Sequence, residues 1–280
     1  MPNAQQIHLA APHLDHIEPA DLNLLTPPTR AAFGRRLYQY NDREGQRWIL
    51  KTQLQNGHAD VATSFQHELA FYEQLNQQHH FVLPYSVMQQ EPNALFGESV
   101  LLLPQADEFL HLPAAQLSYD ACLHRIWQMV NALDEMHQLG WLHADLKAAH
   151  FVEYGKHVCL VDFEQALPCS ANQEPLPTKQ QFVTATPRYM APELFHGEEK
   201  TQQSDLYAFG IILLEWLTGQ RLHAKSYQDW AVLHCQQLKV KLPSDLNVFK
   251  VLLEGLLAKH KNARFANLTQ VKQFLMTEIE

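Results

Sequence analysis

Cysteine is scarce in this sequence, and its spacing shows no motif. The four cysteines are Cys122, Cys159, Cys169 and Cys235, too scattered for a zinc site or a disulfide framework, which suits a reducing compartment. Lysine and arginine form no run, and the formal net charge is -9. An acidic chain without a cluster of basic residues is not attracted electrostatically to nucleic acid or to an anionic membrane, so we expect neither as a partner.

Long apolar segments are lacking as well. The most apolar stretch, Ala208 to Leu217, is interrupted by Gly210 and Glu215 and is too short to cross a bilayer. No charged-then-apolar leader opens the chain. We therefore expect a cytoplasmic protein without a transmembrane segment.

The hydrophobic pattern of the first part of the chain indicates a sheet with one helix. Up to about position 105, short apolar runs alternate with turn-rich gaps, as in strands. The runs lie at 36–40, 47–54, 81–88 and 99–103. Between them, Phe65, Leu69 and Tyr72 recur at helical spacing. Ser64 is placed to cap the start of that helix.

From Ser118 onward, longer helices predominate. The first has its apolar residues on one face and stops at Gly140, and the others are expected at 206–217, 227–238, 246–259 and 268–279. A polar stretch from Pro168 to Thr186 is typical of a surface loop. At 280 residues and 46% hydrophobic, the chain is long enough for one large core or for two modest lobes. We predict an α+β fold with a small β-rich lobe carrying one helix and a larger helical lobe.

Two acidic residues flank a lysine near the middle of the chain. Asp145 and Lys147 lie in the segment His143 to His150, and Asp162 follows seventeen positions after Asp145. Phosphoryl transfer needs a carboxylate that accepts the proton of an attacking hydroxyl, a cation near the moving group, and a second carboxylate that holds a metal. Asp145, Lys147 and Asp162 fit these roles in that order.

These segments resemble the catalytic loop and the metal loop of the eukaryotic-like Ser/Thr protein kinases, a family with bacterial members. Three other segments extend the resemblance over nearly the whole chain. Trp48 to Lys51 is similar to the third-strand lysine motif, Thr186 to Glu193 to the end of an activation segment, and Ser204 to Gly210 to the start of the central buried helix.

The resemblance implies a two-lobed protein-kinase-like fold that uses ATP with Mg²⁺ or Mn²⁺. It divides the chain into an N-terminal extension of unknown role at 1–20, an N-lobe at 21–105 and a C-lobe at 106–280. In the N-lobe it implies that Lys51 contacts the nucleotide phosphates and that Glu68 fixes Lys51.

The resemblance also implies roles that support the site. Glu193 should pair with Arg264, and Asp205 should accept hydrogen bonds from the catalytic-loop backbone. Thr186 should lie near Asp145 and Lys147, an arrangement that accompanies Ser/Thr substrates in the family.

Several positions depart from the family pattern. Of the glycines expected in the phosphate-covering loop, only Gly34 is present, which weakens the expected grip on phosphate. Glu164 replaces the last glycine of the metal loop. Ala144 stands where many kinases have an arginine that pairs with a phosphorylated activation loop, so Thr184 is a poor phosphosite candidate.

His150 stands where the family has a metal-binding asparagine. Neutral imidazole suits Mn²⁺ better than Mg²⁺. A histidine here is also similar to the catalytic loop of lipopolysaccharide core kinases. Contact with a metal or a phosphate and simple packing in the core both remain open for this side chain.

Three hypotheses follow for the function. The leading one is an ATP-dependent Ser/Thr protein kinase that phosphorylates a hydroxyl of a protein substrate. One alternative is a lipopolysaccharide or small-molecule kinase of the same fold, acting on a glycolipid or small molecule. The other is a pseudokinase, which binds nucleotide or acts as a scaffold without turnover. The sequence does not specify an oligomeric state.

Overall fold

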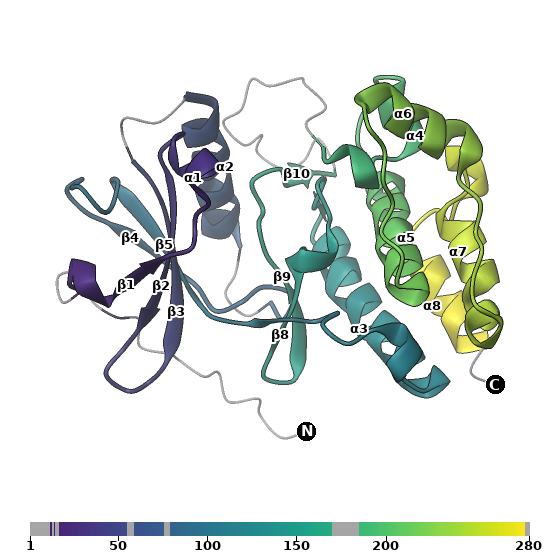
Figure 1. Ribbon diagram of the computed structural model, residues 1–280, viewed down its shortest axis with the longest axis horizontal. Helices are drawn as coiled ribbons and strands as arrows, with labels where there is room; N and C mark the ends of the chain where they lie inside the picture. The colour runs from purple at the N-terminus through teal and green to yellow at the C-terminus, as the bar shows by residue number, and fades with distance from the viewer. Residues whose placement is uncertain are drawn as a thin grey trace. The chain divides into compact units, whose positions relative to one another are not determined.

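Figure 1 shows the computed structural model of the chain, which describes residues 12, 14, 17–54, 59–75, 79–169 and 185–277. Most of the N-terminal extension and most of the loop at 168–186, including Thr184, lie outside the described residues. The chain divides into two compact units. The first comprises 1–77 and 83–106, and the second comprises 78–82 and 107–280.

A five-stranded antiparallel sheet forms the first unit, in the order β1-β2-β3-β5-β4. Its strands are β1 (Leu22–Leu24), β2 (Arg35–Asn41), β3 (Arg47–Gln53), β4 (Ser86–Gln89) and β5 (Ser99–Pro104). The sequence dictates the pleat, because in β3 the side chains of Trp48, Leu50 and Thr52 are buried while their neighbours are less so. The run at 81–88 becomes a strand only at Ser86, since Pro84 cannot donate a ladder hydrogen bond.

The helix of the first unit is α2 (Ala59–Gln74). Phe65, Leu69 and Tyr72 are buried, which confirms the helical periodicity seen in the sequence. The prediction that Ser64 caps the start of this helix is wrong, because the helix begins five residues earlier. Ser64 lies inside it and donates its hydroxyl to the carbonyl of Asp60 (3.0 Å), one turn back.

The connection between β1 and β2 contains a helical turn, α1 (Pro28–Ala31). The Ala32 amide donates to the Pro28 carbonyl (3.1 Å), and Gly34 follows with a φ of 88°, a conformation that favours glycine. Proline at the first helical position is preset for this conformation. The segment aligned with the glycine-rich phosphate loop therefore forms a proline-initiated turn, with Gly34 at its exit.

Two residues of the N-terminal extension pack on the sheet. Leu14 and Ile17 are buried in a cluster with apolar side chains of β2, β3 and β5, including Trp48 and Leu50. Because side chains alternate along a strand, Trp48 and Leu50 point to the face opposite that of Lys51. Leu14 and Ile17 therefore pack on the sheet face that does not carry the Lys51 side chain.

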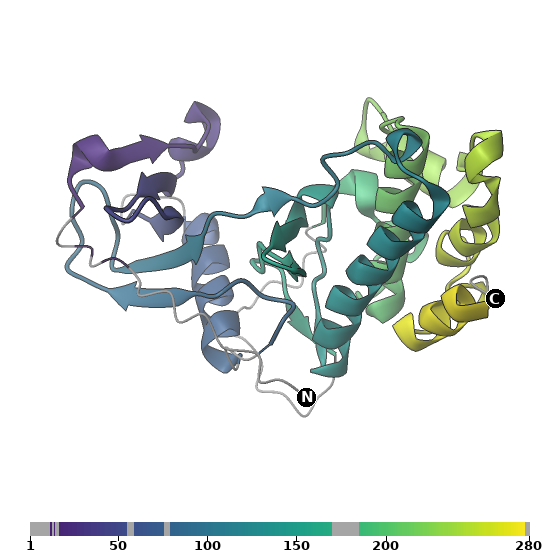
Figure 2. The same ribbon diagram turned by 90° about the horizontal axis from the view of Figure 1, so that it is seen from below.

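The second unit is mainly helical, as Figures 1 and 2 show. Its helices are α3 (Tyr119–Gln138), α4 (Pro192–Phe195), α5 (Gln202–Thr218), α6 (Tyr227–Val232), α7 (Lys250–Leu256) and α8 (Leu268–Thr277). The Ser118 side chain caps α3 by accepting from the Ala121 amide. α5 is buried along nearly its whole length and packs against α7, while α3 packs against α8.

Two small sheets complete the second unit. β6 (Asp107–Glu108), β8 (Phe151–Tyr154) and β9 (His157–Leu160) form one, and β7 (Trp141–Leu142) pairs with β10 (Leu167–Pro168). The predicted α+β class, with a β-rich unit and a helical unit, is confirmed. No helix in the described part of the chain combines the length and apolarity needed to cross a bilayer.

The ion pair expected between Glu193 and Arg264 is present and buried. The guanidinium binds both carboxylate oxygens, at 2.7 and 2.9 Å, and also donates to the carbonyls of Ala258 and Gln203. Burial alone would raise the pKa of Glu193, but the hydrogen bonds and charge of Arg264 outweigh it and lower that pKa. The bidentate geometry ties the end of the activation segment to the C-terminal helices.

Truncation of Leu14 tests whether the extension stabilises the sheet. Leu14→Ala should lower the free energy of unfolding by roughly 2 kcal/mol, the low end for a buried leucine. Leu25→Ala is the matched control, because Leu25 is 41% exposed in the same unit and should change the value by less than about 0.5 kcal/mol. Urea denaturation of the full chain measures both. Equal effects of the two variants would contradict the packing of Leu14.

Removal of the Arg264 guanidinium should lower the free energy of unfolding more than truncation of Leu14. Arg264→Met leaves the buried Glu193 carboxylate unpaired and should lower the free energy of unfolding by about 3–5 kcal/mol at neutral pH. The control Lys250→Met removes the exposed pair with Glu254 (3.7 Å) and should cost about 1 kcal/mol or less.

The difference in free energy of unfolding between the wild type and Arg264→Met should depend on pH in a defined direction. Because the folded-state pKa of Glu193 lies below its ordinary value of 4.5, the pair's contribution is complete above that value. It should be lost as the pH falls through the lower, folded-state pKa. Denaturation curves of the wild type and Arg264→Met should therefore converge in acid, and a difference that persisted at the lowest pH would contradict the ion-pair explanation.

Candidate active site

The catalytic segment is anchored on the carboxylate of Asp205 in α5. That carboxylate accepts from the amides of His143 (2.8 Å) and Ala144 (2.9 Å) and lies 3.0 Å from Nε2 of His137. Burial by itself would raise the pKa of Asp205, but His137 and His143 outweigh it and lower that pKa. The predicted role of Asp205 is confirmed, and His137, on the buried face of α3, is a partner that the motifs did not reveal.

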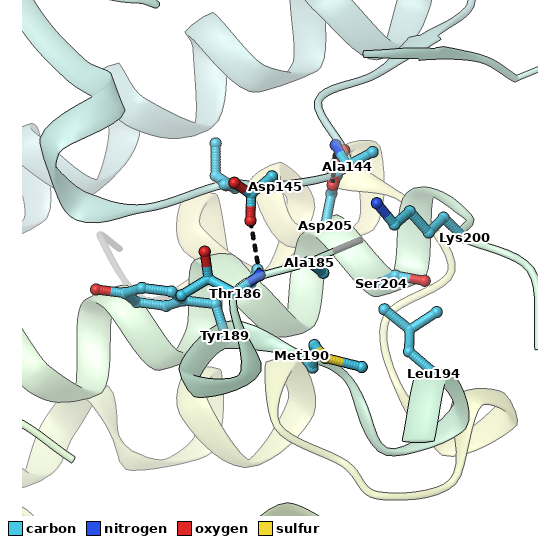
Figure 3. Close-up of a pocket in the computed structure, with 12 residues that line it drawn as sticks. Ala144, Asp145, Ala185, Thr186, Tyr189, Met190, Leu194, Lys200, Ser204 and Asp205 are labelled. Atoms are coloured by element: carbon cyan, nitrogen blue, oxygen red, sulfur yellow. Dashed lines mark hydrogen bonds between the residues drawn. The ribbon is translucent and has the colours of Figure 1, made fainter. Parts of the chain in front are cut away.

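Asp145 is held from two sides. Its Oδ2 lies 2.6 Å from the Lys147 ammonium, and its Oδ1 accepts from the Thr186 amide at 2.9 Å (Figure 3). The expected proximity of Thr186 to Asp145 is therefore confirmed. Ala144, the residue before Asp145, has a φ of 64°, which only a minority of non-glycine residues adopt. A fixed backbone, the Lys147 side chain and the Thr186 backbone amide thus determine where the Asp145 carboxylate lies.

The second acidic residue of the motif, Asp162, faces His150. Nε2 of His150 lies 3.3 Å from Oδ2 of Asp162. The backbone joins the two segments as well, since the Val161 amide donates to the His150 carbonyl (3.1 Å). Asp162 has a φ of 68°, and the next residue, Phe163, is fully buried and anchors this conformation. A carboxylate oxygen and an imidazole nitrogen are thereby held 3.3 Å from each other.

Packing and polar contact coexist at His150. Its ring stacks on that of His143, with centroids 5.1 Å apart, while Nε2 is directed toward Asp162. Burial, followed by the neighbouring His150, lowers the pKa of His143 to about 4. His143 is therefore neutral at physiological pH, and its uncharged ring supports His150 without repelling a cation.

The donor atoms around Asp162 fit a divalent metal. Two ligands at about 2.1 Å from one ion and at right angles are about 3 Å apart, close to the observed separation of His150 Nε2 and Asp162 Oδ2. A carboxylate oxygen of Glu164 lies within 4.8 Å of one of Asp162 and could join them. A set of carboxylates with one imidazole suits Mn²⁺ at least as well as Mg²⁺.

Lys51 and Glu68 form the predicted ion pair within the first unit. The Lys51 ammonium lies 2.7 Å from Oε2 of Glu68, whose side chain is 1% exposed against 13% for that of Lys51. β3 presents the lysine and α2 the glutamate. The pairing is confirmed, while contact of Lys51 and Gly34 with a nucleotide stays a prediction.

A small pocket beside Asp145 contains a charged residue that the motifs did not indicate. The catalytic segment, the end of the activation segment and the connection between α4 and α5 line it together. Lys200, in that connection, shares the pocket with Asp145 and Asp205 (Figure 3). Its only sequence signal is its position directly before the segment that begins α5, so pattern reading alone could not assign it to the site.

Comparison with known proteins agrees with this geometry. The family model for the protein kinase domain matches residues 31–276, so β1 precedes the match. Serine/threonine-protein kinase AtPK2/AtPK19 of Arabidopsis thaliana is 31% identical over 150 residues, which is 50% of this chain and 29% of that protein. Serine/threonine-protein kinase pkn3 of Myxococcus xanthus is 36% identical over 98 residues, 33% of this chain and 18% of that protein.

A third relative matches over a longer segment. Serine/threonine protein kinase ypkA of Aspergillus fumigatus is 27% identical over 203 residues, 71% of this chain and 31% of that protein. The chain thus spans less than a third of the length of these curated relatives. The family model, in contrast, covers both units of the structure, including the Lys51–Glu68 pair and the segments of Asp145 and Asp162. The chain belongs to the protein kinase domain family.

Proposed function

We propose that this chain is an ATP-dependent Ser/Thr protein kinase. The observation that carries the proposal is the placement of Asp145, whose carboxylate is held by the Thr186 amide and by Lys147. An anchored carboxylate in the catalytic segment, next to a lysine, is what transfer of a phosphoryl group to a hydroxyl requires.

Asp145 accepts the proton of the substrate hydroxyl in this reaction. The hydroxyl oxygen forms a new bond to the γ-phosphorus of ATP, the bond between that phosphorus and the β–γ bridging oxygen breaks, and ADP leaves with the bonding electron pair. Lys147, 2.6 Å from Asp145, supplies positive charge where the phosphoryl group passes. Its exposure is about twice that of Asp145, which leaves its ammonium able to reach a ligand.

The remaining site residues bind and orient the nucleotide. Lys51, fixed by Glu68, contacts the α and β phosphates, and Gly34 contributes a backbone without a side chain near them. Asp162 and His150 hold the divalent metal, which when bound neutralises phosphate charge. Asp162 is the more exposed of these two, at 37% against 8%, so its carboxylate would be the more accessible to an incoming metal ion.

The expected substrate is a protein with a Ser or Thr hydroxyl. The Thr186 to Glu193 segment, similar to the peptide-docking segment of Ser/Thr kinases, is well anchored at both ends. Thr186 bonds to Asp145 and Glu193 to Arg264. The names of the relatives in plants, fungi and bacteria agree with this substrate class. The low cysteine content suits action in the cytoplasm.

Substitution of the two aspartates separates their roles. Asp145→Asn should lower kcat by about 10²–10⁴-fold and leave ATP affinity nearly unchanged, because only the proton acceptor is lost. Asp162→Ala should also weaken binding of metal–ATP. Transfer of labelled γ-phosphate to the protein itself and to a generic basic protein measures the first effect, and calorimetric titration with ATP and metal measures the second.

The outcomes distinguish the candidate functions. Label that depends on Asp145 and appears on serine or threonine supports the protein kinase. ATP binding without transfer to any protein acceptor would overturn it in favour of a pseudokinase or of a kinase for glycolipids or small molecules. Equal residual activity of the two variants would contradict the separate roles of Asp145 and Asp162.

Replacement of His150 by the residue usual in the family tests its contact with the metal. His150→Asn should shift the preference from Mn²⁺ toward Mg²⁺ by on the order of tenfold, since it exchanges an imidazole for an oxygen donor. Binding of Mn²⁺ with ATP, followed by electron paramagnetic resonance, measures this directly. His124→Asn, at an exposed position of α3, is the control. An unchanged metal profile with normal folding would limit His150 to packing against His143.

A further inference from the structure

The pocket beside the catalytic segment brings two carboxylates into one partly buried space. Asp145 and Asp205 both line it, and the Asp205 side chain is only 3% exposed. Like charges in a medium of low polarity repel, so such a pair needs positive charge nearby. Lys147 compensates Asp145 from one side, and the donors to Asp205 are two amides and His137.

Lys200 reaches the same pocket from the connection between α4 and α5. In Figure 3 its ammonium end points toward the side where Ala144 and Asp205 lie. Burial lowers the pKa of Lys200, whereas the charges of Asp145 and, to a lesser degree, Asp205 oppose that change. Because Lys200 lines the same small pocket as Asp145 and Asp205, it is close enough to interact electrostatically with both carboxylates.

The backbone around Lys200 is firmly placed. The next residue, Thr201, is the N-cap of α5 in a capping box, and its amide donates to the Ser204 hydroxyl at 3.0 Å. That hydroxyl lies 3.5 Å from Glu193, whose carboxylate is fixed by Arg264. Lys200 thus projects from an anchored position.

The catalytic segment supplies no charge of its own at the adjoining position. Ala144 lines the pocket with a single methyl group, and its φ of 64° is stabilised by the hydrogen bond of its amide to Asp205. An alanine side chain is small and brings no positive charge to the two carboxylates. Among the residues that line this pocket, Lys200 is the cation.

We propose that Lys200 is a positioning residue for the catalytic segment. Its ammonium group attracts both the Asp145 and the Asp205 carboxylates and offsets the repulsion between them. The Asp145 carboxylate is thereby kept in place. The inference rests on the proposed function, because the effect on catalysis passes through Asp145. Lys200 makes no contact with the transferred group and acts only through the two carboxylates.

A variant that removes the charge of Lys200 and one that keeps it should differ in kcat. Lys200→Met should reduce kcat by on the order of tenfold to a hundredfold with little change in the KM for ATP, because a displaced catalytic group slows transfer without weakening nucleotide binding. Lys200→Arg should restore most of kcat. Lys156→Met, at an exposed lysine between β8 and β9, is the control and should match the wild type.

A second measurement needs no catalysis. Hydrogen exchange of the His143 and Ala144 amides, both bonded to Asp205, should be at least several-fold faster in Lys200→Met than in wild type and unchanged in Lys200→Arg and Lys156→Met. The thermal unfolding midpoint shows whether each variant is folded. Should Lys200→Met fail to fold, Lys200→Gln provides the same loss of charge with a polar end.

The two measurements separate the failure of this inference from that of the proposed function. Wild-type kcat and unchanged exchange in the charge-removing variant would overturn the role of Lys200 while leaving the kinase intact. Absence of Asp145-dependent transfer in the wild type would overturn the proposed function, and faster amide exchange confined to the charge-removing variant would still support positioning by Lys200. Loss of kcat that Lys200→Arg does not restore would overturn it in favour of a packing role.

Discussion

The hydrogen bonds accepted by the buried carboxylate of Asp205 hold the catalytic segment on the central helix. A charged acceptor strengthens its bonds to the amides of His143 and Ala144. Those bonds offset the cost of the left-handed backbone at Ala144, which is about 1–2 kcal/mol for a residue with a side chain. Asp145 directly follows Ala144, so the direction of the Asp145 carboxylate depends on the hydrogen bonds that Asp205 accepts from the His143 and Ala144 amides.

The activation segment is tied to the same helix by a second set of charges. Arg264 binds Glu193 at two points, and the Ser204 hydroxyl at the start of α5 lies within reach of Glu193. At its other described end, the Thr186 amide donates to Asp145. Asp145 is therefore constrained by α5 through the catalytic segment and by the activation segment through Thr186. The buried Asp205 carboxylate in α5 and the buried Glu193–Arg264 ion pair beside the start of α5 thus hold both segments.

The sequence predicted the ion pairs and hydrogen bonds between residues of the segments that resemble family motifs. The pairs Lys51–Glu68 and Glu193–Arg264 and the bonds from the catalytic segment to Asp205 are present as expected. Each joins residues far apart in the chain, so no local pattern could reveal it without the family resemblance. The two-unit α+β class followed from hydrophobic periodicity, since the apolar positions of β3 and α2 repeat with the periods of a strand and a helix.

Local choices of backbone conformation were harder to predict. Ser64 is a good capping residue, yet α2 begins earlier, because a serine inside a helix can satisfy its hydroxyl on the preceding turn. The turn α1 arises from Pro28, in a segment where the family pattern calls for glycine. His137 follows Ile126, Val130 and Leu133 on the buried face of α3, so helical spacing could have identified it as buried, although not as a partner of Asp205. Lys200 belongs to no periodic pattern, and only the fold brings it to Asp145.

Two groups of acidic residues in the second unit have different partners. Asp145 and Asp205 share a pocket with Lys200, and Lys147 adds a second lysine beside Asp145, so these acids are compensated by side chains of the chain itself. Asp162 faces His150, which rests on a second imidazole that is neutral at physiological pH because burial depresses its pKa. A neutral support adds no repulsion toward a cation, and Glu164 adds negative charge nearby. Asp145 and Asp205 thus have lysines beside them, while the carboxylate and imidazole donors around Asp162 are a set that a divalent metal would fit.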